Sequence, residues 1–588
     1  MGIFSIMKPL LLLAACGTVC WQMHAQPAFH KTYCNPLDID YRYDFERYEG
    51  DTSYRSGADP VIINHKGEYC LFVTNSGGWW HSKDLGGWEF VTPSMWPDGD
   101  MCAPAVVVVR DTLYLFQSTF EFRPIYFTTK PRSGQLAEFT HQLPPLQGAL
   151  GPWDPALFHD ELTDRWFMYF GSSNEYPIYG IELDHSQKLS YIGEAKPLIL
   201  LDPQQHGWER FGRDHREART PFVEGAWMTK YKGKYYLQYA APGTEYNVYA
   251  NGTYIGDDPL GPFTYASYNP VSYKPGGFVT GAGHGNTFQD NFGNYWNTGT
   301  PWVGVNWNFE RRIAMFPAGF DSDGQMFSNT RFGDFPHYLP KHTWSQKDEL
   351  FTGWMLLSYG KSCQASSVRD SFSATRVTDE NPRTFWVAQN NAPGEWLTID
   401  LGHACQVRAV QVNFADYNSD IYVNDSTVYT LFRISASLDG RRWRKVADLT
   451  RPKRDRPCAY VELRHPCRTR YLRYEHVFAR TTNLAISDFR VFGKGPGRPP
   501  ARPRGLEVRR DTDARNAFLS WNAVPGAVGY NVLWGVKPGK LYQTYQVFAD
   551  CGTTLEIRAL STGQEYSFAV EAFNESGVSN VSPPVHCR

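Results

Sequence analysis

Short apolar runs, each followed by a polar turn and a second run rich in aromatic residues, recur along the first 300 residues. The clearest case starts at Glu224-Gly225, passes through a Lys232-Gly233 turn and returns as an aromatic run over residues 234–239. Two such runs on either side of a Gly-containing turn are typical of a β-hairpin. The pattern therefore predicts a hairpin with the carboxylate of Glu224 at its root.

The same arrangement occurs five times. In each unit a lead residue precedes Pro or Gly, and the partner strand follows shortly after. The five lead residues are Asp59, Ala103, Asp154, Glu224 and His284. Supersecondary units that recur about every 45 to 70 residues are typical of propeller blades. The repeat predicts a five-bladed β-propeller whose lead residues converge at one end of the central funnel.

Three of the five lead residues are carboxylates and one is a histidine. Asp-Pro and Glu-Gly are also ordinary turn dipeptides, which is the structural alternative for any single unit. Acids gathered at equivalent positions repel one another, and such groups are found where a proton or a cationic transition state is handled. We therefore expect the acids to form a catalytic site.

Composition supports an all-β chain of several domains. A chain of 588 residues is too long for a single hydrophobic core. Aromatic residues make up 15% of it, Gly and Pro are frequent, and helical periodicity is scarce, which favours many short strands and turns. The formal net charge of −2 and the lack of a basic face exclude a typical nucleic-acid-binding protein. A balanced, aromatic-rich surface fits a neutral ligand such as a carbohydrate.

The N-terminus is predicted to be a signal peptide over residues 1–25. Lys8 precedes an apolar run, residues 10–20, that is too short for an ordinary membrane span, and a small-residue cleavage site ends at Ala25. The alternative is a bacterial lipoprotein signal with Cys16 as the acylated residue. Both imply export to the periplasm, the cell surface or the medium of a bacterium.

The chain has 11 cysteines and no Cys-x-x-Cys spacing, which argues against a zinc site. Disulfides are permitted outside the cytoplasm. Cys458 and Cys467 are close enough in sequence to be bridged, Cys551 and Cys587 fall in one predicted module, and pairing stays open.

Residues 26–340 resemble glycoside hydrolase family 43, whose members are five-bladed propellers that release terminal pentoses and related sugars. The matching motifs, in order, are Gly57-Ala58-Asp59-Pro60-Val61, Trp153-Asp154-Pro155, Glu224-Gly225-Ala226 and Gly281-Ala282-Gly283-His284-Gly285. The resemblance implies that Asp59 is the general base, that Asp154 modulates the pKa of the acid, and that Glu224 is the general acid. It also implies that His284 helps to hold calcium, partly through water.

This resemblance implies an exo-acting, inverting hydrolase that removes terminal arabinofuranosyl or β-xylosyl residues, with galactofuranosyl as a further option, from plant or microbial polysaccharide. Glycoside cleavage with inversion needs one protonated carboxyl and one carboxylate on opposite faces of the sugar. A raised pKa is expected for Glu224, with Asp154 as its cause. Ala226 departs from the family, where proline is common. The alternatives are a non-catalytic carbohydrate-binding propeller and a propeller that transfers or phosphorolyses mannosides.

Further pocket candidates are Arg312, by resemblance to the substrate-binding arginine of the family, and tryptophans that could stack on sugar rings. The tryptophans are Trp79, Trp153 and Trp227, with Trp80, Trp302 and Trp307 as further options. Some of these must be core residues. A charged stretch, residues 213–217, could border the pocket or be a solvated loop.

Two further modules are predicted after a connection over residues 341–362. Residues 363–494 resemble a discoidin-like (coagulation factor type C) jelly roll, the shape of many carbohydrate-binding modules, through Trp396-Leu397-Thr398-Ile399-Asp400-Leu401-Gly402. Residues 495–503 form a Pro-rich linker. Residues 504–588 resemble an immunoglobulin-like fibronectin type III sandwich, with Tyr566 as its corner tyrosine.

Overall fold

A computed structural model describes residues 31–42, 55–95, 102–116, 118, 125–139, 146, 153–305, 308–419, 421 and 426–587. Within these ranges the regular structure consists of strands and short 3₁₀ helices, which confirms the all-β prediction. None of the helices described is long and apolar enough to cross a membrane. The predicted signal peptide and Cys16 lie outside the described residues.

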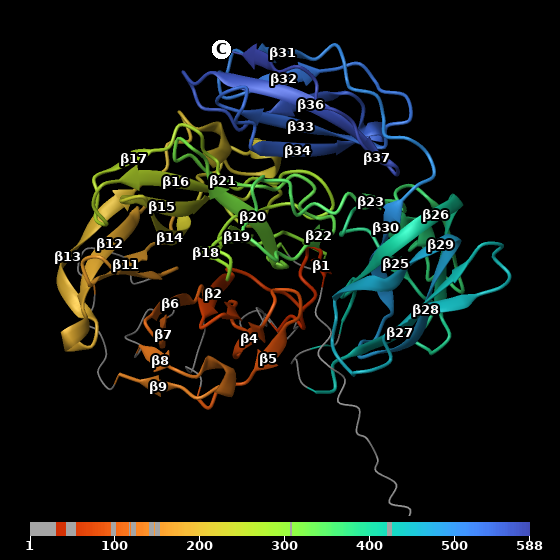
Figure 1. Cartoon of the computed structure of the whole chain (residues 1–588), viewed down its shortest axis with the longest axis horizontal. Coiled ribbons are helices and arrows are strands. Elements are labelled where there is room, and N and C mark those ends of the chain that lie inside the picture. Colours follow the sequence, from red (N-terminus) through yellow and green to blue (C-terminus); the bar gives the residue numbers. More distant parts are fainter. Residues whose placement is uncertain are drawn as a thin grey trace, which may run out of the picture.

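The first part of the chain folds into consecutive four-stranded antiparallel sheets arranged as a ring (Figure 1). The sheets are β2 (Val61–His65), β3 (Glu68–Phe72), β4 (Trp79–Ser82) and β5 (Glu89–Val91); β6 (Ala105–Val109), β7 (Thr112–Phe116), β8 (Tyr126–Thr128) and β9 (Ala137–Glu138); β10 (Ala156–Asp160), β11 (Arg165–Phe170), β12 (Ile178–Asp184) and β13 (Ser190–Ile199); β14 (Glu224–Tyr231), β15 (Lys234–Ala241), β16 (Ala250–Gly256) and β17 (Phe263–Tyr265); and β18 (Thr287–Gln289), β19 (Tyr295–Gly299), β20 (Ala314–Phe320) and β21 (Met326–Ser328). Short 3₁₀ helices in this part are η1 (Pro131–Ser133), η2 (His185–Gln187), η3 (Gly207–Glu209) and η4 (Arg213–His215).

The predicted hairpin at Glu224 is confirmed as β14 and β15. Glu224 lies opposite Ala240, and a register shift follows before Trp227 pairs with Gln238. The turn residues Lys232 and Gly233 both have positive φ, 47° and 79°. Such a two-residue turn matches the twist of the strands, and glycine tolerates its backbone without strain.

The ring is closed by contacts between the first strand of each sheet and that of a neighbour. β2 contacts β6, β6 contacts β10, and β10 contacts β14, while β18 returns to contact β2. Asn286, just before β18, accepts a hydrogen bond from the Ile62 amide at 2.9 Å and donates one to the Ile62 carbonyl at 2.7 Å. The last sheet is therefore joined directly to the first.

The described N-terminal segment also fastens the ring. β1 (Thr32–Tyr33) pairs with β22 (His337–Tyr338), which follows the last sheet. The start and the end of the ring-forming segment thus lie side by side.

The second module is built on a sheet with the order β23-β30-β26-β29-β27-β28, to which β24 and β25 are added. Its strands are β23 (Met355–Leu356), β24 (Ser362–Ala365), β25 (Trp386–Val387), β26 (Trp396–Phe414), β27 (Thr430–Ser437), β28 (Arg444–Asp448), β29 (Cys458–Ala479) and β30 (Ala485–Lys494), with η5 (Ala374–Thr378) between them. β23 lies inside the stretch predicted as a connection, residues 341–362. Its two residues form an apolar pair too short to show an alternating pattern, and they pair with Gly493 and Phe492 of β30.

The third module has two sheets and lies at the top of the view in Figure 1. The strands are β31 (Glu507–Arg510), β32 (Ala517–Ser520) and β35 (Thr554–Ile557) in one sheet, and β33 (Gly529–Gly535), β34 (Gln543–Phe548), β36 (Tyr566–Asn574), β37 (Gly577–Val578) and β38 (Val585–Cys587) in the other, with η6 (Ala549–Cys551). The Tyr566 hydroxyl accepts a hydrogen bond from the Ser561 amide at 3.0 Å, a contact back to the preceding backbone that is typical of a corner tyrosine.

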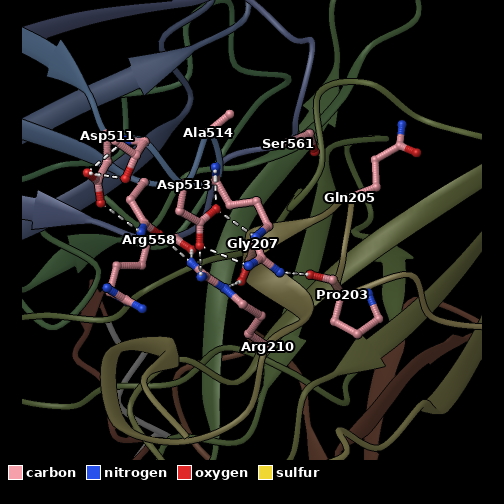
Figure 2. A network of polar contacts seen from close by, with 12 residues as sticks. Pro203, Gln205, Gly207, Arg210, Asp511, Asp513, Ala514, Arg558 and Ser561 are labelled. Carbon is pink, nitrogen blue, oxygen red and sulfur yellow. Dashed lines mark hydrogen bonds and ion pairs between the residues drawn. The ribbon is translucent and has the colours of Figure 1, made fainter. Parts of the chain in front are cut away.

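The third module shares a hydrophobic core with the ring. Trp208 and Tyr239 from the ring belong to the same buried cluster as Trp534 and Tyr566. Figure 2 shows polar contacts at this junction, where the guanidinium of Arg210 is paired with the Asp513 carboxylate at 3.1 Å. The shared core holds the third module against the segment that leads to Glu224.

The second module is joined to the ring by a buried ion network. The guanidinium of Arg55 donates to the Asp416 carboxylate at 3.0 Å and to the Asp455 carboxylate at 2.7 Å, and its backbone amide donates to Asp416 at 3.1 Å. These side chains are only 4%, 1% and 1% exposed. Arg55 lies four residues before Asp59, so the network fixes the approach to the first lead residue.

Seven cysteines among the described residues are free thiols: Cys34, Cys70, Cys363, Cys405, Cys458, Cys467 and Cys551. Cys458 and Cys467, considered for a bridge, lie on the same strand, β29, where they pair with Asn413 and Val407 of β26. Two residues that far apart along one extended strand cannot approach to disulfide distance.

Loss of the Arg55 network is expected to destabilise the protein. Arg55→Ala leaves two buried carboxylates without their cation, which should lower the free energy of unfolding by about 3–5 kcal/mol. The measurement is equilibrium urea unfolding followed by tryptophan fluorescence.

The matched control is Arg470→Ala, which removes a partly exposed ion pair with Asp400 in the same module. Exposed pairs contribute about 0–1 kcal/mol, so this variant should unfold close to the wild type. Equal losses for the two variants would show that burial of the Arg55 network does not stabilise the junction.

Candidate functional site

Four of the five lead residues share one unusual backbone conformation. Asp59, Ala103, Asp154 and His284 have φ values of 54°, 43°, 46° and 45°. Such values are uncommon for residues other than glycine and carry a cost that the surrounding structure must offset. Glu224 differs because it is the first residue of β14, and there the positive φ of 63° falls on Gly225.

A hydroxyl from the neighbouring sheet supports three of these four positions. Thr74, two residues after β3, accepts a hydrogen bond from the Ala103 amide at 2.8 Å, and Ser118, two residues after β7, accepts one from the Asp154 amide at 2.8 Å. Thr300, directly after β19, accepts one from the Asp59 amide at 3.0 Å. These bonds pass from one sheet to the lead residue of the next and hold the strained backbones in place.

Hydroxyl groups also contact the carboxylates themselves. Thr74 donates to Asp59 Oδ2 at 2.6 Å, and Ser172, two residues after β11, donates to Glu224 Oε2 at 2.9 Å. The Tyr249 hydroxyl donates to Glu224 Oε1 at 2.5 Å. Glu224 is thus oriented through both of its oxygens.

His284 brings the acids together. Its Nδ1 lies 3.1 Å from Asp59 Oδ1 and 3.8 Å from Asp154 Oδ2. A Cβ at Gly225 would lie 2.9 Å from Cγ of His284, so only glycine leaves room for the imidazole there. The glycine after Glu224 therefore serves the packing of the histidine as well as the turn.

The electrostatics of the site are set by burial and by mutual charge. Burial raises the pKa of Asp154 to about 7, an effect that the charge of His284 opposes and those of Glu224 and Asp59 reinforce. Burial lowers the pKa of His284, but the carboxylates of Asp59, Asp154 and Glu224 outweigh it and raise the pKa above its usual value. The site thus contains a carboxyl group with a raised pKa, that of Asp154, and the role of Glu224 as the general acid stays a prediction.

Of the two adjacent arginines, Arg311 is the one beside the acids. Its Nη1 lies 3.7 Å from Asp59 Oδ1 and donates to Thr244 at 3.2 Å. Arg312, the residue singled out from the sequence, is 2% exposed and stacks over the ring of Tyr41 at 5.2 Å. Consecutive residues of an extended segment point to opposite sides, and the sequence does not show which side faces the site.

The tryptophans selected from the sequence have different surroundings. Trp79 is fully buried and stacked on Phe72, while Trp153 is partly exposed next to Asp154. Trp227 is half-buried and donates from Nε1 to the Thr287 carbonyl at 3.0 Å, which links β14 to β18. Trp80 is also buried, and Trp307 lies outside the described residues.

The site offers both oxygen and nitrogen atoms as possible ligands, whereas calcium prefers six to eight oxygen ligands. His284 offers a nitrogen and is already paired with Asp59, beside which Arg311 adds positive charge. Within the described part of the chain, the group of three potential metal ligands that lie close enough together is His403, Cys405 and Glu575, away from the lead residues. Calcium at His284 stays a prediction.

The supporting residues Thr74, Ser118 and Ser172 escaped the sequence reasoning, although a signal for them exists. Each follows the phenylalanine that ends the second strand of its unit, in Phe72-Val73-Thr74, Phe116-Gln117-Ser118 and Phe170-Gly171-Ser172. A repeated hydroxyl at a fixed offset from a repeated strand marks a shared structural role. No comparable repeated pattern in the sequence points to Tyr249 or Arg311.

Comparison with known proteins matches two regions of the chain to families. Residues 53–324 match glycosyl hydrolases family 43, and residues 362–483 match the F5/8 type C domain. A β-xylosidase of Xylanibacter ruminicola is 50% identical over 149 residues, 22% of this chain and 43% of the relative. A xylosidase/arabinosidase of Bacteroides ovatus is 50% identical over 77 residues, 13% of this chain and 21% of the relative. The chain thus spans less than half the length of these curated relatives.

Among solved structures, Bacteroides ovatus xyloglucan PUL GH43B is 14% identical, with 95% of this chain and 98% of that chain covered and a TM-score of 0.41. The first matched region contains all of the lead residues, and the second contains most strands of the second module. The chain therefore carries a glycosyl hydrolases family 43 domain, which holds Asp59, Asp154, Glu224 and His284, followed by an F5/8 type C domain.

Proposed function

We propose that the protein is an exo-acting, inverting glycoside hydrolase that removes terminal arabinofuranosyl or β-xylosyl residues from polysaccharide or oligosaccharide. The observation that carries the proposal is the largely buried cluster of Asp59, Asp154 and Glu224 around His284, whose side chains are 11–13% exposed for Asp59, Asp154 and His284, and in which Asp154 has a pKa raised to about 7. Such clusters manage protons during bond cleavage. The names of the two xylosidase relatives support the choice of sugar, and galactofuranosyl remains a further option.

In the proposed mechanism, Glu224 protonates the glycosidic oxygen and Asp59 takes a proton from the attacking water. Asp59 faces His284 and Arg311 and accepts from Thr74, surroundings that suit a carboxylate. Asp154 and Glu224 repel each other when both are ionised, so we propose that the pair retains one proton near neutral pH. Movement of that proton to Glu224 prepares the acid for the leaving group.

The remaining expectations form part of the same proposal. The consecutive sheets are blades of one five-bladed propeller, and the third module is a fibronectin type III domain. Calcium near His284 would act mainly by supplying positive charge, and no step of the mechanism depends on it. The chain is exported, with residues 1–25 as its signal peptide.

The experiment that tests the function is a screen of nitrophenyl α-L-arabinofuranoside, β-D-xyloside and β-D-galactofuranoside with the full chain. Proton NMR of the first-formed anomer then reports the stereochemistry. We expect hydrolysis of at least one glycoside with inversion. Initial retention would overturn the inverting mechanism, and binding of oligosaccharides without hydrolysis of any substrate would favour the carbohydrate-binding alternative.

Substitution of the lead carboxylates is expected to remove most activity. Asp59→Asn and Glu224→Gln each lose a proton-transfer group and should lower kcat by about 10²–10⁴-fold, as is typical for general acid–base groups. The measurement is steady-state hydrolysis of the best nitrophenyl glycoside. Glu161→Gln, at an exposed acid of the same domain, serves as the control and should leave kcat unchanged.

Asp154 is expected to make stability depend on pH. Because its pKa rises from 3.8 to about 7 on folding, the folded protein binds more protons than the unfolded chain between these values. The contribution of Asp154 to the free energy of unfolding therefore falls as the pH rises from about 4 to 7. At 1.36 kcal/mol per pKa unit, the fall is on the order of 4 kcal/mol. Asp154→Asn should lose this dependence.

The measurement is urea unfolding at pH 5 and at pH 8 for the wild type and for Asp154→Asn. The expected result is a variant that is relatively more stable than the wild type at pH 8 and much less active. A pH dependence of the same size in both proteins would contradict the assignment of the raised pKa to Asp154.

A further inference from the structure

Two arginines from different parts of the chain stack on one tryptophan of the ring. The guanidinium carbon of Arg213 lies 5.3 Å from the centre of the Trp302 ring, and that of Arg383 lies 4.5 Å from it. Arg213 belongs to η4, before β14, whereas Arg383 belongs to the second module. The second module therefore places a cationic side chain on the ring-forming domain.

This cluster lies beside the lead carboxylates. Trp302 follows Thr300, whose hydroxyl accepts from the Asp59 amide, by two residues, which span at most about 7 Å. Trp302 also pairs with Arg311, the arginine 3.7 Å from Asp59. The tryptophan on which the two arginines stack thus pairs with a residue that lies 3.7 Å from the proposed base, Asp59.

The cluster also approaches the side of the proposed acid. The ring of Tyr246 lies 6.4 Å from that of Trp302. Its neighbour Glu245 is close enough to Glu224 for the charge of Glu224 to help raise the pKa of Glu245, mainly a result of burial. The cluster around Trp302 is therefore linked to the surroundings of Glu224 as well as to those of Asp59.

Neither arginine has a carboxylate within ion-pair distance among the described residues. The acids next to them are engaged elsewhere. Asp214 accepts from Asn247 and Tyr545, Asp379 accepts from Thr384, and Glu380 is paired with Arg490. Burial and the charge of Arg213 lower the pKa of Arg383, so Arg383 is partly desolvated and lies close enough to Arg213 for the two charges to repel.

Both arginines are held in place by the modules around them. The segment of Arg213 is fixed by Tyr545, which donates to Asp214 at 3.1 Å, and by the Arg216–Glu556 pair with the third module. The backbone amide of Arg383 donates to Asn381 Oδ1 at 3.2 Å in a turn ahead of β25. Arg383 is partly buried and Arg213 is exposed, and both guanidinium groups lie on one ring without an internal anion. Their like charges repel, and a bound anion offsets that repulsion.

We infer that Arg213 and Arg383 bind the carboxylate of an acidic sugar, a uronate, beside the lead carboxylates. This inference rests on the proposed function, because it assigns the partner of the same site. A planar carboxylate matches the fork of a guanidinium, and the rest of a sugar ring can lie against the Trp302 cluster. The second module then takes part in substrate recognition at the site itself.

The test compares an arabinose-substituted xylo-oligosaccharide that carries one glucuronate with its carboxyl-reduced form, which differs only in charge. Binding to the full-length Glu224→Gln protein is measured by isothermal titration calorimetry, so that turnover does not interfere. We expect the acidic form to bind about 10- to 100-fold tighter, the range of charge-assisted hydrogen bonds. The preference should shrink in 0.5 M NaCl because salt screens the charges.

Arg383→Gln and Arg213→Gln, each added to Glu224→Gln, should bring the affinity ratio of the two forms close to one. Arg441→Gln, at an exposed arginine elsewhere on the second module, is the matched control and should keep the ratio. If one variant fails to fold, as judged by its thermal unfolding, the other variant and the salt dependence still test the inference.

Equal affinity for the two forms, or no measurable binding of either, overturns the inference. Hydrolysis of nitrophenyl glycosides by the wild type is scored separately. Hydrolysis without charge discrimination leaves the proposed function intact and removes only the uronate site. Charge discrimination without hydrolysis of any glycoside keeps the uronate site and removes the hydrolase.

Discussion

Closure of the ring between its last and first sheets is the constraint on which the site depends. The side chain of Asn286 forms hydrogen bonds with both the amide and the carbonyl of Ile62, and the Thr300 hydroxyl accepts a hydrogen bond from the Asp59 amide. These buried bonds bring Asp59 and His284, from opposite ends of the ring-forming segment, to a separation of 3.1 Å. Each bond contributes modestly, but an unpaired buried amide costs more than a bond gains, so opening the ring between these sheets is unfavourable.

The site combines groups that are unfavourable one at a time. Three carboxylates gathered beneath the surface repel, and the left-handed backbones at Asp59, Asp154 and His284 are strained. The imidazole of His284 and the guanidinium of Arg311 offset the charge, while hydroxyls such as Ser118 hold the backbone. The repulsion that these groups do not offset, together with burial, raises the pKa of Asp154. The packing of the site thus bears directly on its proton chemistry.

The sequence was most informative where the repeat imposes the structure. The strand–turn–strand units and the lead residues follow from local patterns, and the structure places Asp59, Asp154 and His284 together as that repeat predicts. What the sequence left open depends on contacts between distant segments. Nothing in the local pattern distinguishes Arg311 from Arg312, or shows that Arg55 will meet Asp416 in another module. The strand at Met355, only two residues long, is likewise defined by its partner in β30.

Ala103 is the lead residue without a functional group, yet its backbone conformation and its support by Thr74 match those of its acidic counterparts. In this architecture the position of a lead side chain is set by the backbone and by a hydroxyl from the neighbouring sheet, and its chemistry is set separately by the residue type. Duplicated units can therefore diverge one side chain at a time while the frame is retained. The ring thus provides one more lead position than the proposed reaction uses, from which a related chain could acquire a new specificity or a different reaction.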